Sequence, residues 1–195
     1  VEDGVAVVML NRPDKLNAWR GEMDRDVRAA MREAADDPAV KVIILTGAGK
    51  GFCAGADMNM LQTIQSGDAS TSRSAVNALE PWDKTANENF QKQYSWFPAV
   101  QKPIIAAING AAAGLGLIIS LYCDIRLASD KAKFTTAFSR RGLVAEHGIR
   151  VPFAILKLPA QHNVADSFWR PGNLACGLDV DSGAPGWQHL TGRIA

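Results

Sequence analysis

The chain has 195 residues, of which 47% are hydrophobic and 21% are charged, and its formal net charge is +1. This composition is typical of a globular protein with one sizeable core. No long run of like charges occurs, so the sequence predicts neither a nucleic-acid-binding surface nor a polybasic membrane patch.

The cysteines are odd in number and show no paired spacing: Cys53, Cys123 and Cys176. The first residues also lack the basic and then apolar pattern of a secretion signal. Both observations predict a cytoplasmic protein with reduced thiols. The histidines and cysteines are scattered along the chain, so no metal site is expected.

The first predicted elements are a strand and an amphipathic helix. The strand is the valine-rich run Val5–Leu10, which ends at the turn Asn11-Arg12-Pro13. The helix is predicted by apolar residues that recur with helical spacing: Met23, Val27, Ala30, Met31 and Ala34. We expect this stripe to pack against the core.

A second buried strand is predicted at 41–46, followed by a glycine-rich loop at 47–51 and the start of a helix within 52–57. The mostly polar stretch 59–101 predicts a loop, with helix resuming beyond Glu80.

A third buried strand is predicted at 104–108 and a helix at 111–122. The apolar stretch 104–123 is long enough to cross a bilayer in principle. The turn signal Asn109-Gly110 interrupts it, so a strand followed by a helix is the better interpretation, and no membrane association is expected.

Strands that alternate with helices predict an α/β layered domain, with ligands bound where strands end and helices begin. Two such junctions, 51–57 and 110–116, are rich in glycine, which lets backbone N–H groups approach a ligand closely. Neither is a phosphate-loop or dinucleotide motif: Gly51 stands where the first needs Ser or Thr, and the second lacks a third glycine. Taken alone, a junction of this kind is more often a tight turn than a ligand site.

Three blocks of sequence contain these features: Asn11-Arg12-Pro13 with Leu16-Asn17-Ala18, 51–57, and 108–124. They resemble, in order and spacing, the signature blocks of the enoyl-CoA hydratase/isomerase (crotonase) family, over residues 1 to about 149. The resemblance implies an α/β crotonase-like spiral of repeated ββα units. It also implies an acyl-CoA thioester as the substrate, no permanently bound cofactor, and a homotrimer or hexamer.

The resemblance implies specific site residues as well. The backbone N–H groups of Ala56 and Leu115 would form an oxyanion hole for the thioester oxygen. Contacts to the nucleotide or the pantetheine arm of coenzyme A are implied for Lys15, Leu16, Ala54 and Asp57. From the sequence alone, Lys15 could equally be a solvated surface lysine.

The type of reaction depends on the carboxylates. The two catalytic acids of the family's hydratases align with Ile118 and Phe138, which cannot move a proton and are expected to line the acyl pocket. Glu146 resembles the single glutamate of members that move double bonds, and His147 could orient it or form a surface pair. Double-bond migration, hydration, dehalogenation, thioester hydrolysis and acyl-CoA binding without catalysis all remain open.

The resemblance ends after Ile149. Residues 150–195 are rich in proline and glycine, which makes long regular helices unfavourable. We therefore expect a crotonase-like core at 1–149 and an atypical segment at 150–195 that is irregular, truncated or altered.

Overall fold

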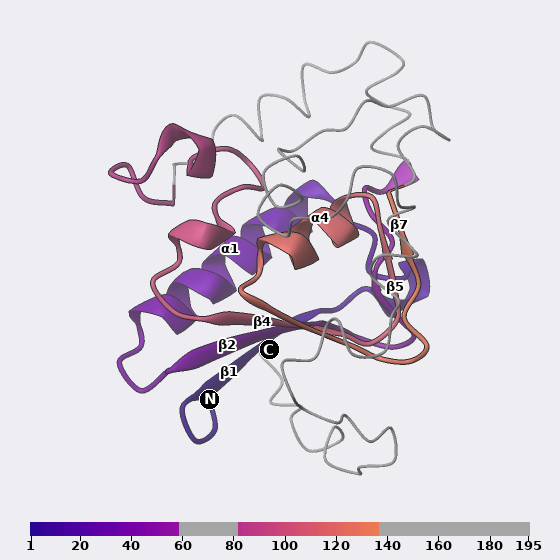
Figure 1. The fold of residues 1–195 in the computed structure, drawn as a ribbon, viewed down its shortest axis with the longest axis horizontal. Helices are drawn as coiled ribbons and strands as arrows, with labels where there is room; N and C mark the ends of the chain where they lie inside the picture. Colours follow the sequence, from indigo (N-terminus) through magenta and orange to yellow (C-terminus); the bar gives the residue numbers. More distant parts are fainter. Residues whose placement is uncertain (59–81, 137–195) are drawn as a thin grey trace, which may run out of the picture.

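The computed structural model describes residues 1–58 and 82–136 (Figure 1). Strands alternate with helical segments through these two ranges. In chain order the elements are β1 (Val5–Leu10), η1 (Pro13–Lys15), α1 (Gly21–Asp36), β2 (Val42–Gly47), β3 (Gly51–Cys53), η2 (Glu88–Phe90), η3 (Phe97–Ala99), β4 (Ile104–Ile108), β5 (Ala111–Ala113), α4 (Leu115–Tyr122), β6 (Ile125–Ala128) and β7 (Phe134–Thr135), where η marks a 3-10 helix.

The described strands form two parallel sheets, one with the order β1-β2-β4-β6 and one with the order β3-β5-β7. Each of β2, β4 and β6 in the first sheet is followed along the chain by a strand of the second sheet. Helical structure follows both β3, from Met58, and β5, as α4. The chain therefore winds in turns that give one strand to each sheet, which confirms the predicted spiral of ββα units.

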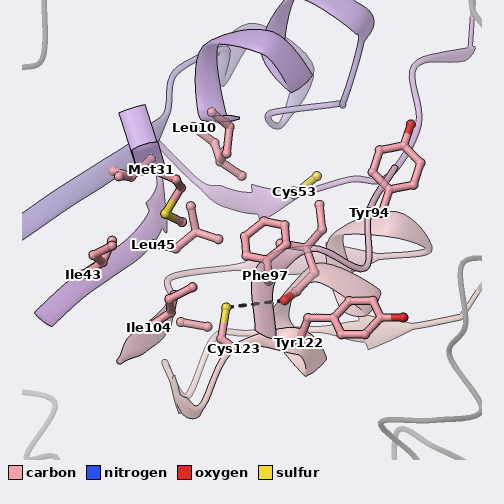
Figure 2. Packing of buried hydrophobic residues seen from close by; sticks show 14 of the residues in the cluster. Leu10, Met31, Ile43, Leu45, Cys53, Tyr94, Phe97, Ile104, Tyr122 and Cys123 are labelled. Atoms are coloured by element: carbon pink, nitrogen blue, oxygen red, sulfur yellow. Dashed lines mark hydrogen bonds between the residues drawn. The ribbon is translucent and has the colours of Figure 1, made fainter. Parts of the chain in front are cut away.

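The hydrophobic core lies between the first sheet and the helices. In β1 and β2 every second side chain is buried, and the predicted stripe of α1 faces the same core. Figure 1 shows α1 and α4 on one side of the four-stranded sheet. Figure 2 shows how side chains from α1, β2, η3 and β4 meet in one cluster, with Met31, Leu45, Phe97 and Ile104 among them.

The three long predicted strands, the first helix and, from Leu115 to Tyr122, the helix expected at 111–122 are confirmed, but the predicted starts of two helices are wrong. Strand β3 takes Gly51 from the expected loop and residues 52 and 53 from the expected helix start, and residues 111–113 are strand β5 instead of the first turn of a helix. These segments pair with each other, with Cys53 opposite Ala112. Pairing across the sheet outweighs the high helix propensity of alanine here.

The helix expected beyond Glu80 is also absent from the described residues of that region. Between 82 and 101 the structure has two short 3-10 helices, η2 and η3, and Pro98 lies inside the second one. Aromatic side chains hold this segment against the core, with the rings of Trp82 and Trp96 stacked at a centroid distance of 4.7 Å. Side-chain stacking therefore replaces regular helix packing in this stretch.

None of the helices within 1–58 and 82–136 is long and apolar enough to cross a membrane. The boundary predicted at Ile149 lies outside the described residues. The division into a core at 1–149 and an atypical segment at 150–195 therefore stays a prediction.

Asp24 is a carboxylic acid on the buried face of α1, and it is only 1% exposed. Its Oδ1 accepts a hydrogen bond from Trp19 Nε1 at 3.3 Å, and its Oδ2 lies 4.0 Å from Arg28 Nε. Loss of hydration raises the pKa of Asp24 to about 6, and the charge of Arg28 and the hydrogen bond from Trp19 offset only part of this effect.

The buried Asp24 predicts a pH-dependent stability. The folded protein binds the Asp24 proton more tightly than the unfolded chain, whose pKa is near 3.8, so this contribution is full below pH 3.8 and is lost as the pH rises through about 6. The side chain introduced by Asp24→Asn cannot titrate. As the pH rises through this range, the unfolding free energy of the unaltered protein should therefore fall by about 3 kcal/mol relative to that of the variant. Urea unfolding from pH 4 to pH 7 measures it, and the same pH dependence in both proteins would contradict a buried, titrating Asp24.

Candidate active site

The two glycine-rich junctions lie against each other through their backbones. A Cβ atom added to Gly55 would lie 2.8 Å from the carbonyl oxygen of Ala113 and 3.7 Å from the backbone nitrogen of Leu115. A Cβ atom added to Gly116 would lie 2.2 Å from the carbonyl oxygen of Cys53. Gly55 also has a φ of +95°, which side chains of L-residues rarely allow. Glycine is thus required for the two junctions to approach this closely.

Ala56 is held by a short stretch of parallel pairing with Trp19. The N–H of Trp19 donates to the Gly55 carbonyl oxygen at 2.7 Å, and its carbonyl oxygen accepts from the Asp57 N–H at 2.9 Å. Successive N–H groups of an extended chain point to opposite sides. The N–H of Ala56 therefore points away from Trp19, and this pairing leaves it available as a donor.

Leu115 is the first residue of α4, directly after Gly114, which has a φ of +49°. The first N–H groups of a helix have no acceptor within the helix, and α4 makes its first internal bond from the Ile118 N–H to the Gly114 carbonyl oxygen. The helix dipole makes the N–H of Leu115 an electropositive donor. Its side chain is buried in the core cluster, so at this residue the backbone is the group that can meet a ligand.

Two asparagine side chains hold the turn between β2 and β3. Asn17 is fully buried, and its Nδ2 donates to the carbonyl oxygens of Ala48 at 2.9 Å and Gly51 at 2.8 Å. Asn109 Nδ2 donates to the carbonyl oxygen of Gly49 at 2.9 Å. The first and third sequence blocks therefore supply the amide groups that fix the loop leading into the second block.

An ion pair joins the first and second blocks. Arg12 Nη1 donates to Asp57 Oδ2 at 2.5 Å and to the Ala18 carbonyl oxygen at 3.1 Å. Both charged side chains are mostly buried, so solvent screens this pair less than one on the surface. The Asp57 carboxylate is thus engaged within the protein, and its expected contact with coenzyme A stays a prediction.

The other three residues expected to contact coenzyme A lie near one another. Lys15 and Leu16 are exposed at the end of η1, and Leu16 is 42% exposed, which is unusual for a leucine. The N–H of Ala54 donates to the Leu16 carbonyl oxygen at 2.9 Å. The structure therefore places all three beside the first junction, while the coenzyme A contact itself stays a prediction.

The candidate residues for the reaction are only partly described. Ile118 is fully buried in α4, whereas Phe138, Glu146 and His147 lie outside the described residues. Cys53 is fully buried among apolar side chains, and burial raises the pKa of its thiol to about 12 (Figure 2). The thiol therefore stays protonated and is not a nucleophile, which agrees with a packing role.

Sequence reasoning assigned no individual role to Trp19, Asp24 or the two asparagines. A signal existed for Asp24, which lies three residues before Val27 and seven before Met31, so a charge falls on the apolar stripe of the helix. The hydrogen bonds of Asn17 and Asn109 join residues distant in the chain. No local pattern predicts those partners.

The comparison with known families agrees with this geometry. The family described as enoyl-CoA hydratase/isomerase matches residues 1–162. The chain belongs to this family. The match extends beyond Ile149, the expected end of the resemblance.

Individual members of the family show both the likeness and its extent. The chain is 34% identical to the 1,2-epoxyphenylacetyl-CoA isomerase of Escherichia coli K12, over 76% of this chain and 53% of that protein. It is 37% identical to the crotonyl-CoA hydratase of Syntrophomonas wolfei, over 68% of this chain and 46% of that protein. The chain thus spans about half the length of these relatives.

Solved structures of the family have the same fold. A protein of Mycobacterium abscessus described as an enoyl-CoA hydratase/isomerase matches with a TM-score of 0.67 and 31% identity, over 80% of this chain and 56% of that one. An enoyl-CoA hydratase of Mycobacterium avium subsp. paratuberculosis matches with a TM-score of 0.57 and 33% identity, over 79% of this chain and 55% of that one. The expected crotonase-like fold is confirmed.

The contact between the junctions predicts that Gly55→Ala is destabilising. The added Cβ meets the carbonyl oxygen of Ala113 at 2.8 Å and the φ of +95° strains any L-residue, so the unfolding free energy should fall by about 2 kcal/mol or more. Gly21→Ala is the matched control, because nothing lies within 4 Å of its added Cβ and alanine favours the helix. Urea unfolding compares the two, and equal stability of both variants would contradict the close contact.

Proposed function

We propose that the chain acts on acyl-CoA thioesters through an enolate, which is stabilised by the backbone N–H groups of Ala56 and Leu115. The observation that carries this proposal is the contact between the two junctions, where a Cβ on Gly55 would lie 3.7 Å from the Leu115 nitrogen. The names of the isomerase from Escherichia coli and the hydratase from Syntrophomonas wolfei both specify a coenzyme A thioester. These names support a thioester substrate and leave the reaction open.

The chemistry needs two fixed donors aimed at one oxygen. Removing a proton next to a thioester carbonyl places negative charge on its oxygen, and donors already in place stabilise that charge without reorganising. The pairing with Trp19 leaves the Ala56 N–H available, and the start of α4 does the same for Leu115. The dipole of α4 adds positive potential at the second donor.

Coenzyme A would bind beside the first junction. The exposed ammonium of Lys15 suits a phosphate, and the exposed side chain of Leu16 offers an apolar surface to the pantetheine arm. Ala54 lies next to Leu16 through their backbone hydrogen bond. Coenzyme A enters as part of the substrate, so the proposed reaction needs no permanently bound cofactor.

Glu146 is the proposed acid and base. The buried side chain of Ile118 cannot move a proton, which favours a reaction that needs a single carboxylate. In double-bond migration, Glu146 would remove a proton from C2 of a 3-enoyl thioester and return it at C4, while the two N–H groups hold the dienolate. Hydration of a 2-enoyl thioester is the alternative that the test must separate.

The donor at Leu115 can be deleted without deleting the helix. Proline is tolerated as the first residue of a helix, and the ψ of −114° at Gly114 avoids the region where a following proline clashes. Leu115→Pro should lower kcat by about 100- to 1,000-fold, because one oxyanion donor is lost. Leu115→Ala shortens the side chain but keeps the N–H, so most of the activity should remain. Equal losses in steady-state assays of both variants would contradict a role for the N–H.

The role of Glu146 is tested with two substrates. Purified protein is incubated with a 3-enoyl-CoA and with a 2-enoyl-CoA, and conjugation and hydration are followed separately. Glu146→Gln keeps the shape but removes the base, so isomerisation should fall by at least about 100-fold. Glu22→Gln, an exposed change on α1, is the matched control and should leave the rate unchanged.

Each result assigns a different chemistry. Isomerisation that Glu146→Gln abolishes supports the single-glutamate mechanism, whereas hydration that this variant leaves intact contradicts it. Absence of turnover with retained binding of coenzyme A would instead identify an acyl-CoA-binding protein. Calorimetry with a non-hydrolysable acyl-CoA ether measures that binding.

A further inference from the structure

Trp19 connects the helix α1 to the backbone around Ala56. Its backbone N–H donates to the carbonyl oxygen of Gly55 at 2.7 Å, and its carbonyl oxygen accepts from the N–H of Asp57 at 2.9 Å, so it bonds to both neighbours of Ala56. Its side chain is 1% exposed and extends into the core, where Nε1 donates to Asp24 Oδ1 at 3.3 Å. Trp19 therefore contacts the backbone on either side of Ala56 through its main chain, and α1 through its side chain.

The indole ring is held in place by two contacts from different elements. Asp24 lies on α1, a 16-residue helix whose buried side chains anchor it to the core. Tyr94, from the segment between η2 and η3, packs edge to face against the ring, with centroids 6.3 Å apart and an interplanar angle of 85°. A displacement of Trp19 would move Gly55 and Asp57 together, and it would turn the Ala56 N–H that lies between them.

A comparison within the same core indicates why Asp24 is present. Trp96 is 0% exposed, and among the described residues its indole Nε1 has no hydrogen-bond partner. Within 1–58 and 82–136, the core therefore contains one buried tryptophan whose N–H has no acceptor. Burying the carboxylate of Asp24 costs free energy, and satisfying the indole N–H of Trp19 is not by itself a sufficient reason for it. The hydrogen bond fixes where the Trp19 ring, and hence its backbone, lies.

We propose that Trp19, held by Asp24 and Tyr94, is a positioning residue that aims the Ala56 N–H at the thioester oxygen. The inference rests on the proposed oxyanion hole and adds to it the side chains that set the direction of one donor. Direction matters because a hydrogen bond prefers a donor angle above about 150° and weakens steeply below about 120°. A misdirected donor should therefore weaken polarisation of the carbonyl without removing the binding site.

The test uses a substrate analogue whose colour reports on the carbonyl. The coenzyme A thioester of 4-(dimethylamino)cinnamic acid absorbs at longer wavelength when hydrogen bonds draw electrons towards its carbonyl oxygen. The unaltered protein, Trp19→Phe and the matched control Trp96→Phe are compared. Both variants lose an indole of the same core, but within the described part of the chain only Trp19→Phe loses a hydrogen bond.

We expect the bound probe to be red-shifted in the unaltered protein and in Trp96→Phe. In Trp19→Phe the shift should fall by about half or more while the Kd of the probe changes less than about threefold, because the donor is misdirected but still present. On a true substrate kcat should fall by about tenfold, less than the 100-fold or more for a deleted donor, with KM nearly unchanged. An equal red shift in Trp19→Phe and Trp96→Phe would overturn the inference.

A pair of changes at Asp24 separates positioning from general stability. Asp24→Asn keeps an oxygen acceptor for the indole and should preserve the red shift, whereas Asp24→Leu removes the acceptor and should reduce it as Trp19→Phe does. If the red shift varies with the melting temperature of the variants, whether or not residue 24 can accept the indole hydrogen bond, the positioning role is overturned. Binding without any red shift in the unaltered protein would refute the proposed oxyanion hole itself, and with it this inference.

Discussion

Close contact between backbones, with no room for a Cβ atom, is the constraint on which the rest of the structure depends. A Cβ atom on Gly110 would lie 2.0 Å from the carbonyl oxygen of Lys50, and one on Gly116 would lie 2.2 Å from that of Cys53. Parallel pairing of β3 with β5 requires these approaches. The amide groups of Asn17 and Asn109 then fix the loop that enters β3, so the site is held by hydrogen bonds to the main chain.

How much of the fold the sequence predicts depends on the length of each element. The strands β1, β2 and β4 and the helix α1 are long enough to show their own periodicity, and they lie where the pattern places them. β3 and β5 have three residues each, too few to show any period, and they exist because they pair with one another. In the site, glycine predicts both junctions, whereas the contacts of Trp19 and Asn17 join distant residues and follow only from the fold.

Two of the four buried polar residues in the described part of the chain, Asn17 and Asp24, act on the first junction. Asn17 donates to the carbonyl oxygen of Gly51 in the junction and to that of Ala48 just before it, and Asp24 reaches the junction through the indole of Trp19. Burying such groups adds little net stability even when each finds a partner. Their contribution is a unique conformation of the loop around Ala56, which an apolar core alone would specify less well.

The spiral fold itself determines the spacing of the two proposed N–H donors. The two candidate donors, Ala56 and Leu115, follow the neighbouring strands β3 and β5, and neighbouring strands in a sheet are separated by about 4.8 Å. Two N–H groups at that separation can share one oxygen atom at about 2.9 Å from each nitrogen. The spacing of the two donors then follows from strand pairing, and Trp19 is proposed to set the direction of one of them. Substitutions elsewhere around the pocket could therefore change the reaction while the hydrogen-bonding site for the oxygen stays the same.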